Sequence, residues 1–186
     1  LSDETPVTAG WGEPSPFKHV PSFERWRFNH RTRTDPEPYG RKFPFVQTSD
    51  VRSAGHYIIT VAQSLSVSGK RISKSFPTGT ALMGIAANVG DIAVTTFETW
   101  CPDSVVGFIP GPPVDPDYLY FLLRGLRRQI NETSRENTQE NTNLERLGCL
   151  RFPLPSMSAQ RAVAASLVKA ELLVFALASA LKRQID

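Results

Sequence analysis

The stretch from residue 156 to residue 185 constrains the fold more than any other part of the chain, because it contains neither glycine nor proline. Alanine, leucine, lysine, arginine and glutamine dominate it, and these residues favour the α-helix. Pro153 and Pro155 lie just before it and end any preceding strand, because proline donates no backbone hydrogen bond. Ser156 or Ser158 is then a suitable N-cap. We therefore predict one long helix here.

Apolar residues recur along this helix at alternating spacings of four and three, which predicts a coiled-coil seam that needs a second helix. The predicted seam consists of Val163, Leu167, Ala170, Val174, Leu177 and Leu181. Leu172, Leu173 and Phe175 widen the apolar face, and the alternative is an ordinary helix packed on its own domain. A helix of about 27 residues is about 40 Å long, so we expect part of it to project as a spacer or docking surface.

The totals indicate one globular domain with an appendage. The chain has 186 residues, of which 40% are hydrophobic and 21% are charged. It has no uninterrupted run of 18 apolar residues, and its first residues lack the features of a signal peptide, so we expect no membrane span. Cys101 and Cys149 are too few for a disulfide framework or a zinc site, and they favour a reducing, cytoplasmic location.

Charge is distributed unevenly along the chain. Residues 18–75 carry a net charge of +7 and residues 121–186 carry +4, whereas residues 1–17 carry −3 and residues 76–120 carry −5. Basic segments separated by a long neutral-to-acidic segment favour a nucleic-acid-binding face. The alternative is a set of solvated basic faces without a partner.

The middle of the chain is the part most typical of β-structure. Apolar segments at residues 81–85, 92–97 and 104–109 alternate with glycine-containing turns, and residues 43–48 and 57–67 are further candidate strands. This spacing predicts an α+β fold with a small, curved, mainly antiparallel, barrel-like sheet and flanking helices.

The flanking segments define three expected regions. Residues 1–22 are rich in proline and form a predicted leader or linker, residues 23–155 a predicted globular domain, and residues 156–186 the long helix. Asp115-Pro116-Asp117 is a strong helix start, and an apolar stripe continues that helix to about residue 130. Residues 131–143 are all polar and are predicted to be a loop.

We find no catalytic motif. Gly69-Lys70-Arg71 lacks the first glycine and the hydroxyl of a phosphate-binding loop, and the chain has no Asn-Pro-Pro-aromatic sequence of adenine methyltransferases. His19, His30 and His56 are scattered and resemble no metal-binding set. We therefore expect no catalytic residue, no metal and no cofactor in this chain.

Two groups of polar residues are candidate DNA contacts. Lys70, Arg71 and Lys74 on a predicted turn suit phosphates. Thr138, Gln139 and Asn141 in the polar loop offer amide and hydroxyl groups that can bond base edges, although such a loop can equally be just solvated. Thr95, Thr96 and Trp100, on the turn past the central hairpin, are secondary candidates.

Several stretches in this order resemble a known family. They are Phe45-Val-Gln-Thr-Ser-Asp-Val51, Pro77-Thr-Gly-Thr-Ala-Leu-Met-Gly-Ile85, Val89-Gly-Asp-Ile-Ala-Val94, Cys101 to Val106, Tyr118-Leu-Tyr-Phe-Leu122, Asn137-Thr-Gln-Glu-Asn-Thr-Asn-Leu144 and Phe152-Pro-Leu-Pro-Ser-Met-Ser-Ala-Gln160. Over residues 23–185 the chain resembles the target recognition domain plus conserved-region helix of the DNA specificity subunit of Type I restriction–modification systems. The family's Pro-Leu-x-Glu-Gln run is replaced here by a sequence that lacks the acid.

The resemblance implies a non-catalytic subunit that reads one half of a bipartite double-stranded DNA target. It also implies binding to a methyltransferase subunit, which carries S-adenosylmethionine and modifies adenine, to a restriction subunit, and self-association through the helix. A full specificity subunit has two recognition domains and two helices, so the chain resembles a half subunit. The alternatives are the recognition module of a fused restriction–modification enzyme, a stand-alone DNA nuclease or methyltransferase, and an adaptor that uses its coiled coil without binding DNA.

Overall fold

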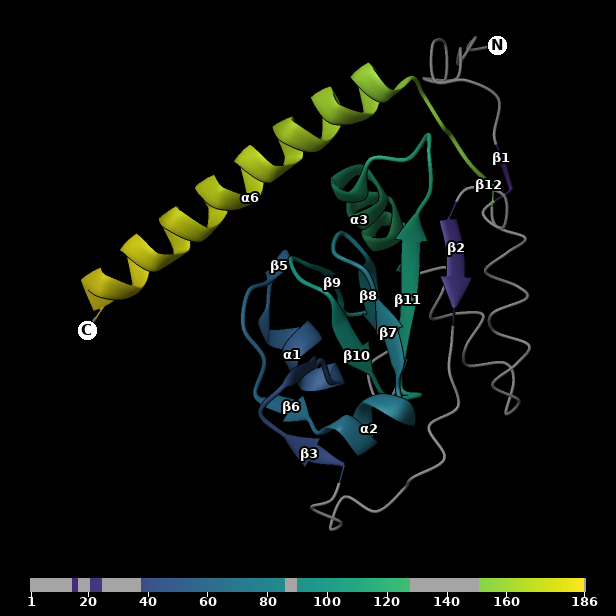
Figure 1. Cartoon of the computed structure of the whole chain (residues 1–186). Coiled ribbons are helices and arrows are strands. Elements are labelled where there is room, and N and C mark those ends of the chain that lie inside the picture. Colours follow the sequence, from purple (N-terminus) through teal and green to yellow (C-terminus); the bar gives the residue numbers. More distant parts are fainter. Residues whose placement is uncertain (1–14, 17–20, 25–37, 86–89, 128–150, 186) are drawn as a thin grey trace, which may run out of the picture.

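The computed structural model describes residues 15–16, 21–24, 38–85, 90–127 and 151–185. These residues form a mixed α+β domain of two open five-stranded sheets, from which one long helix extends (Figure 1). The predicted fold class is therefore confirmed, with open sheets in place of a closed barrel.

The central sheet is buried on both of its faces. Its strand order is β2-β11-β8-β9-β5, and only the β5–β9 pair is parallel. The strands are β2 (Pro21–Glu24), β5 (Tyr57–Ile58), β8 (Ala81–Gly84), β9 (Ile92–Thr95) and β11 (Val105–Pro110). Every residue of β8 and β9 is buried, which explains why their sequences are almost continuously apolar.

The second sheet lies beside the central sheet and has the strand order β3-β6-β4-β10-β7. Its strands are β3 (Tyr39–Gly40), β4 (Phe43–Phe45), β6 (Gln63–Leu65), β7 (Lys74–Phe76) and β10 (Thr99–Cys101). The β4–β10 pair is parallel and the others are antiparallel. A separate antiparallel pair joins β1 (Ser15–Pro16) to β12 (Arg151–Phe152).

The two larger sheets pack face to face through a shared hydrophobic core. Phe76 and Cys101 of the second sheet contact Leu82 and other apolar residues of the central sheet in one cluster. Gly107 in β11 permits this approach, because a Cβ atom at that position would lie 2.3 Å from the Phe76 ring. The other face of the central sheet packs against helix α3 (Pro116–Gly125).

Helix α3 begins where the sequence predicts it. The Asp115 carboxylate accepts hydrogen bonds from the backbone N–H groups of Asp117 and Tyr118, at 3.1 Å each. Such an N-cap contributes about 1 kcal/mol. The helix ends at Gly125, and the predicted continuation towards residue 130 lies largely outside the described residues.

Two short helices correct the sequence predictions. Helix α1 (Thr48–Ser53) begins where the predicted strand was expected to end, because the Asp50 carboxylate accepts the Gln47 backbone N–H at 2.8 Å and starts a helix. Helix α2 (Val67–Arg71) replaces the predicted turn, because Ser66 Oγ accepts the Gly69 N–H at 3.1 Å. Both errors arise from polar side chains that cap a helix of fewer than seven residues.

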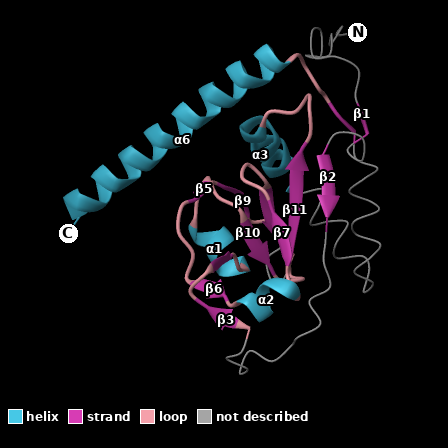
Figure 2. Cartoon of the chain, viewed as in Figure 1, coloured by secondary structure: helices cyan, strands magenta, loops and turns pink. Residues whose placement is uncertain are grey.

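Helix α6 (Met157–Ile185) is the predicted long helix. Figure 1 shows it crossing above α3, and its C-terminal half extends beyond the sheets. The strands and helices of the domain lie below its N-terminal half in the same view (Figure 2). The predicted domain boundary at residue 22 stays a prediction. Strand β2 includes residues on both sides of that boundary.

Candidate functional site

The outer face of the second sheet combines aromatic rings with basic side chains, and we call it the basic–aromatic face. Phe43 and Trp100 meet edge to face with their centroids 5.1 Å apart. The Lys70 ammonium lies 4.6 Å from the Phe43 centroid and 5.1 Å from the Trp100 centroid. Lys42 also lies over the Phe43 ring, at 5.7 Å. These cation–π contacts hold ammonium groups at the surface of the sheet.

Lys42 and Lys70, which lie over these rings, are exposed, and so are their sequence neighbours Arg41 and Arg71. Between residues 38 and 85 the chain has six lysine and arginine residues, and Asp50 is the one acid. This part of the chain therefore has a surplus of positive charge, which attracts phosphate groups.

The predicted DNA contacts divide into three groups. Lys70 and Arg71 are exposed in α2, and Lys74 is partly buried in β7. Thr138, Gln139 and Asn141 lie outside the described residues. The remaining three lie around the turn between β9 and β10.

Two of those three side chains are buried, and a role of the three in DNA binding stays a prediction. Thr95 is fully buried and its hydroxyl donates to the Phe97 carbonyl at 2.7 Å, and Trp100 is a buried core residue. Neither side chain is exposed for a direct contact with DNA. Thr96 is exposed, but its hydroxyl donates to the Ile58 carbonyl at 2.8 Å.

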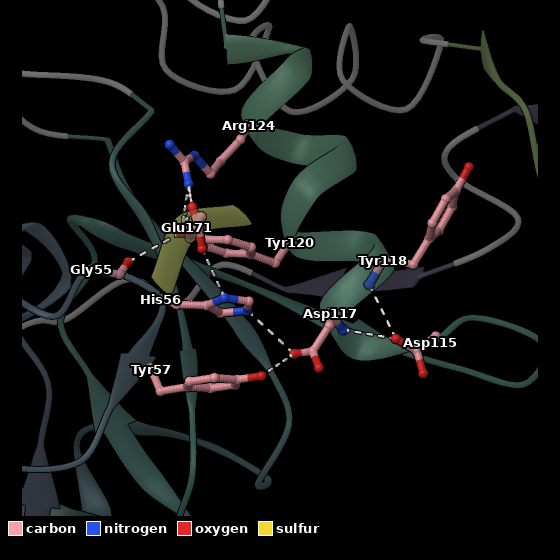
Figure 3. Close-up of polar contacts among 9 residues, drawn as sticks. All are labelled: Gly55, His56, Tyr57, Asp115, Asp117, Tyr118, Tyr120, Arg124 and Glu171. Atoms are coloured by element: carbon pink, nitrogen blue, oxygen red, sulfur yellow. Dashed lines mark hydrogen bonds and ion pairs between the residues drawn. The ribbon is translucent and has the colours of Figure 1, made fainter. Parts of the chain in front are cut away.

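A second candidate region, which we call the helix anchor, attaches α6 to the domain (Figure 3). His56, which precedes β5, stacks between the rings of Tyr57 and Tyr120 at centroid distances of 4.0 and 3.8 Å. Its Nδ1 is 3.1 Å from Glu171 Oε2 on α6. Its Nε2 lies 3.3 Å from Asp117 Oδ1, which is ion-pair distance, but the atom makes no hydrogen bond.

Acidic and basic groups of α3 complete the helix anchor. Arg124 forms an ion pair with Glu171 and donates to the Tyr120 hydroxyl at 3.0 Å. The Tyr57 hydroxyl donates to Asp117 at 2.8 Å, and burial together with this carboxylate raises the pKa of Tyr57 to about 12. Burial also lowers the pKa of His56 below 6.5, although Asp117 acts in the opposite direction. His56 therefore favours its neutral form in the folded chain.

Gln160 provides the other attachment of α6. Its side chain is fully buried, and its amide nitrogen donates to the carbonyls of Pro113 and Pro155 at 2.8 Å each. Its amide oxygen accepts the Asp115 backbone N–H at 2.9 Å. One side chain thus joins the start of α6 to the segment before α3, a role that the sequence analysis did not predict.

The predicted seam lies beside the face that carries these attachments and contributes none of their polar contacts. Gln160, Ala164 and Glu171 contact the domain, whereas Val163 is partly buried. The exposed members of the seam are Leu167, Ala170, Val174, Leu177 and Leu181. Leu177 is 64% exposed and Phe175, beside the seam, is 74% exposed. The described chain therefore leaves this apolar surface uncovered.

By length and composition alone, α6 is apolar enough over residues 157–183 to cross a membrane, which is weak evidence for a span. The expectation of no span rested on uninterrupted apolar runs, and Lys169 and Glu171 interrupt this one. Glu171 is bound to the domain, and the charge-free stretch beyond it, residues 172–181, is about 15 Å long. That is about half of the hydrocarbon core of a bilayer.

Among the residues that the structure describes, no group of three His, Cys, Asp or Glu side chains is placed to hold a metal ion. Cys101 is a free, buried thiol, and burial raises its pKa. Neither the basic–aromatic face nor the helix anchor pairs a nucleophile with a base. The first is arranged to attract anions and the second to fix a helix.

Comparisons with known proteins agree with this architecture. The sequence model described as "Type I restriction modification DNA specificity domain" matches residues 29–185. No curated protein sequence matches the chain.

Solved structures share the fold at low sequence identity. The HsdS subunit from Thermoanaerobacter tengcongensis superposes with a TM-score of 0.68 and 17% identity, over 95% of this chain and 41% of that one. A chain from a structure described as explaining complex assembly and conformational transition of the type I R-M system gives 0.71 and 17%, over 95% and 42%. The S subunit from M. genitalium gives 0.57 and 12%, over 86% and 39%. The present chain thus spans about two fifths of each.

Proposed function

The chain belongs to the family of Type I restriction modification DNA specificity domains, and from that premise we propose that it recognises one half of a bipartite double-stranded DNA target. In this proposal the chain directs a partner adenine methyltransferase, which supplies S-adenosylmethionine, to that target. A restriction subunit is a further expected partner, and the location is cytoplasmic.

The basic–aromatic face is the observation that carries the DNA-binding part of the proposal. The exposed ammonium groups of Lys42 and Lys70 lie over aromatic rings on one face of a sheet, and their sequence neighbours Arg41 and Arg71 are exposed as well. Cations of this kind neutralise phosphates and position a protein on the duplex, whereas base contacts add the sequence information. The predicted base contacts in the polar loop, Thr138, Gln139 and Asn141, stay a prediction.

The exposed seam of α6 supports the partner part of the proposal. Residues 172–181 are apolar, small or Ser and almost all exposed, and an isolated apolar patch of this kind marks an interaction surface. A heptad spacing suits a second helix, from another copy of this chain or from the methyltransferase. Residues 23–155 would then read DNA while residues 156–186 join the subunits.

Co-expression with the adjacently encoded methyltransferase, followed by genome-wide mapping of methyladenine, tests the proposal. Methyladenine in a split motif is the expected result, and two symmetric halves would indicate a half subunit that pairs with a second copy. An asymmetric motif would indicate that a second recognition domain completes the subunit, as in a fused enzyme. Absence of both methylation and co-purification would overturn the assignment of a methyltransferase partner.

The alternative of an adaptor that does not bind DNA makes a different prediction. Its binding to any partner would be insensitive to DNA, and its affinity for duplexes would be weak and nearly independent of salt. Phosphate contacts instead make affinity fall steeply as salt rises. A salt titration with any duplex therefore separates the two functions.

A further inference from the structure

We propose that Gln47 and Gln63 form a base-reading pair on the basic–aromatic face, specific for an adenine edge in the major groove. This inference rests on the proposed DNA recognition. It adds to that proposal the two residues that read one position of the target and the base that they prefer there. The Gln47 amide nitrogen donates to Gln63 Oε1 at 2.6 Å, at the exposed end of the second sheet.

The sheet register places the pair on the same face as the cations. Gln63 lies opposite Phe45 in the antiparallel β4–β6 pair, and Phe43 lies opposite Leu65. Side chains alternate along a strand, so Gln63 shares a face with Phe43, and diagonal neighbours of this kind are about 7–8 Å apart. Gln63 and the Phe43 ring, over which the Lys70 ammonium lies, are therefore neighbours on one face of the sheet.

Asp50 holds the two chain segments that carry the glutamines. One carboxylate oxygen accepts the backbone N–H of Gln47 at 2.8 Å, and the other accepts the backbone N–H of Ala62 at 3.2 Å. The residue next to Ala62 is Gln63, so one carboxylate fixes the backbone at both members of the pair. A pair that is already in place loses less conformational entropy when it binds.

The hydrogen-bonding groups that remain match adenine. Gln63 Oε1 accepts one bond from Gln47 and keeps a second lone pair, and no hydrogen bond from the Gln63 amide nitrogen is present among the described residues. A carboxamide bonds adenine through its N–H to N7 and through its oxygen to the N6 amino group. Guanine presents an acceptor in place of that amino group, so the same amide rejects it. Both glutamines are uncharged, which suits reading a base and not binding a phosphate.

Selection of duplexes from a random-sequence library by the purified 186-residue chain, followed by sequencing, tests the pair. The wild-type chain should enrich a motif that contains an adenine, and Gln63→Ala should relax that position by about 5- to 150-fold while the other positions stay unchanged. Gln63→Glu keeps the acceptor for Gln47 and loses the donors, so it should shift the same position towards cytosine. Gln47→Ala should weaken the preference at that position alone.

Thr60→Ala, an exposed polar change in the loop before β6, is the matched control and should leave the motif unchanged. An unchanged motif in both Gln63 variants would overturn the base-reading pair while leaving DNA recognition intact. A wild-type chain that enriches no motif would overturn both. Gln63→Glu keeps the test decisive if Gln63→Ala does not fold.

Discussion

At the residue scale, the arrangement separates cations that face solvent from polar groups that serve the fold. Arg71 is exposed in α2, whereas Thr95 uses its hydroxyl inside the core. A threonine that bonds a nearby carbonyl and one that bonds a base look the same in a sequence. That is why the predicted set of DNA-contacting residues included both buried and exposed side chains.

Arg71→Ala should weaken duplex binding about equally for all sequences, because a phosphate contact carries no base information. The slope of log affinity against log salt should become shallower by about one. Fluorescence anisotropy with a labelled duplex measures this slope. The salt concentration should be varied between about 50 and 200 mM, a range over which phosphate contacts lose much of their affinity. Lys182→Ala, an exposed cation near the end of α6, is the control and should keep the wild-type slope. Equal slopes for Arg71→Ala and wild type would remove Arg71 from the interface.

His56 should make the stability of the chain depend on pH. Burial lowers its pKa below 6.5 in the folded chain, so the unfolded chain binds the proton more readily. The free energy of unfolding should therefore be fully retained above pH 6.5, and it should fall as the pH falls from 6.5 towards the folded pKa. The groups that face the ring are Asp117, Arg124, Tyr57, Tyr120 and Glu171.

His56→Phe keeps a ring between the two tyrosines and removes the titrating group, so its stability should vary less over this range. Urea unfolding at several pH values between about 5 and 8 measures both chains. A wild-type stability that rises as the pH falls below 6.5 would contradict the lowered pKa.

At the element scale, segments that are buried on both faces were predictable and short capped elements were not. The strands β8, β9 and β11 follow from continuous apolar sequence, and the long helix follows from a stretch without glycine or proline. Strand β10 has three residues, Thr99–Cys101, and was not predicted, because its position depends on pairing with β4 and β7. The helix anchor was also missed, since His56 and Glu171 are 115 positions apart.

Gly107→Ala should destabilise the packing of the two sheets. Its Cβ atom would overlap the Phe76 ring, and overpacking of a filled core costs about 1–3 kcal/mol. The midpoint of urea unfolding should fall accordingly. Gly55→Ala is a poor control because Gly55 has a positive φ, so Gly125→Ala, where nothing lies within 4 Å of the new Cβ, is the matched change.

Adding Phe76→Leu to Gly107→Ala should recover part of the lost stability, because the smaller side chain vacates the space. A double variant no more stable than the sum of the single changes would show that the glycine matters for another reason.

At the scale of the whole molecule, the described chain consists of a packed domain and the long helix α6, which is attached to one side of the domain. The attachment uses polar bonds at Gln160 and Glu171, and the exposed seam contributes none of them. The domain itself therefore does not need the seam in order to fold.

Leu177→Asp should leave the fold intact and abolish association through α6, because Leu177 is 64% exposed and a carboxylate in a helix–helix contact is strongly unfavourable. Light scattering of the purified chain, and co-purification with the methyltransferase, measure the two kinds of association. Ala178→Asp introduces the same charge at an exposed position outside the predicted seam and is the control. Normal assembly of Leu177→Asp would show that the seam is not the contact surface.

The two attachment points also make α6 a mechanical lever. Gln160 and Glu171 are about 16 Å apart along the axis, and the last described residue of the helix, Ile185, is about 37 Å from Gln160 at 1.5 Å per residue. With Gln160 as the fulcrum, a sideways shift of about 1 Å at Glu171 moves Ile185 by about 2.3 Å. A shift of about 1.5 Å moves it by about 3.4 Å, one base-pair step. The contacts of Glu171 with His56, Tyr120 and Arg124 thus limit how far α6 can tilt relative to the domain. They therefore also limit how far a partner bound near Ile185 can move.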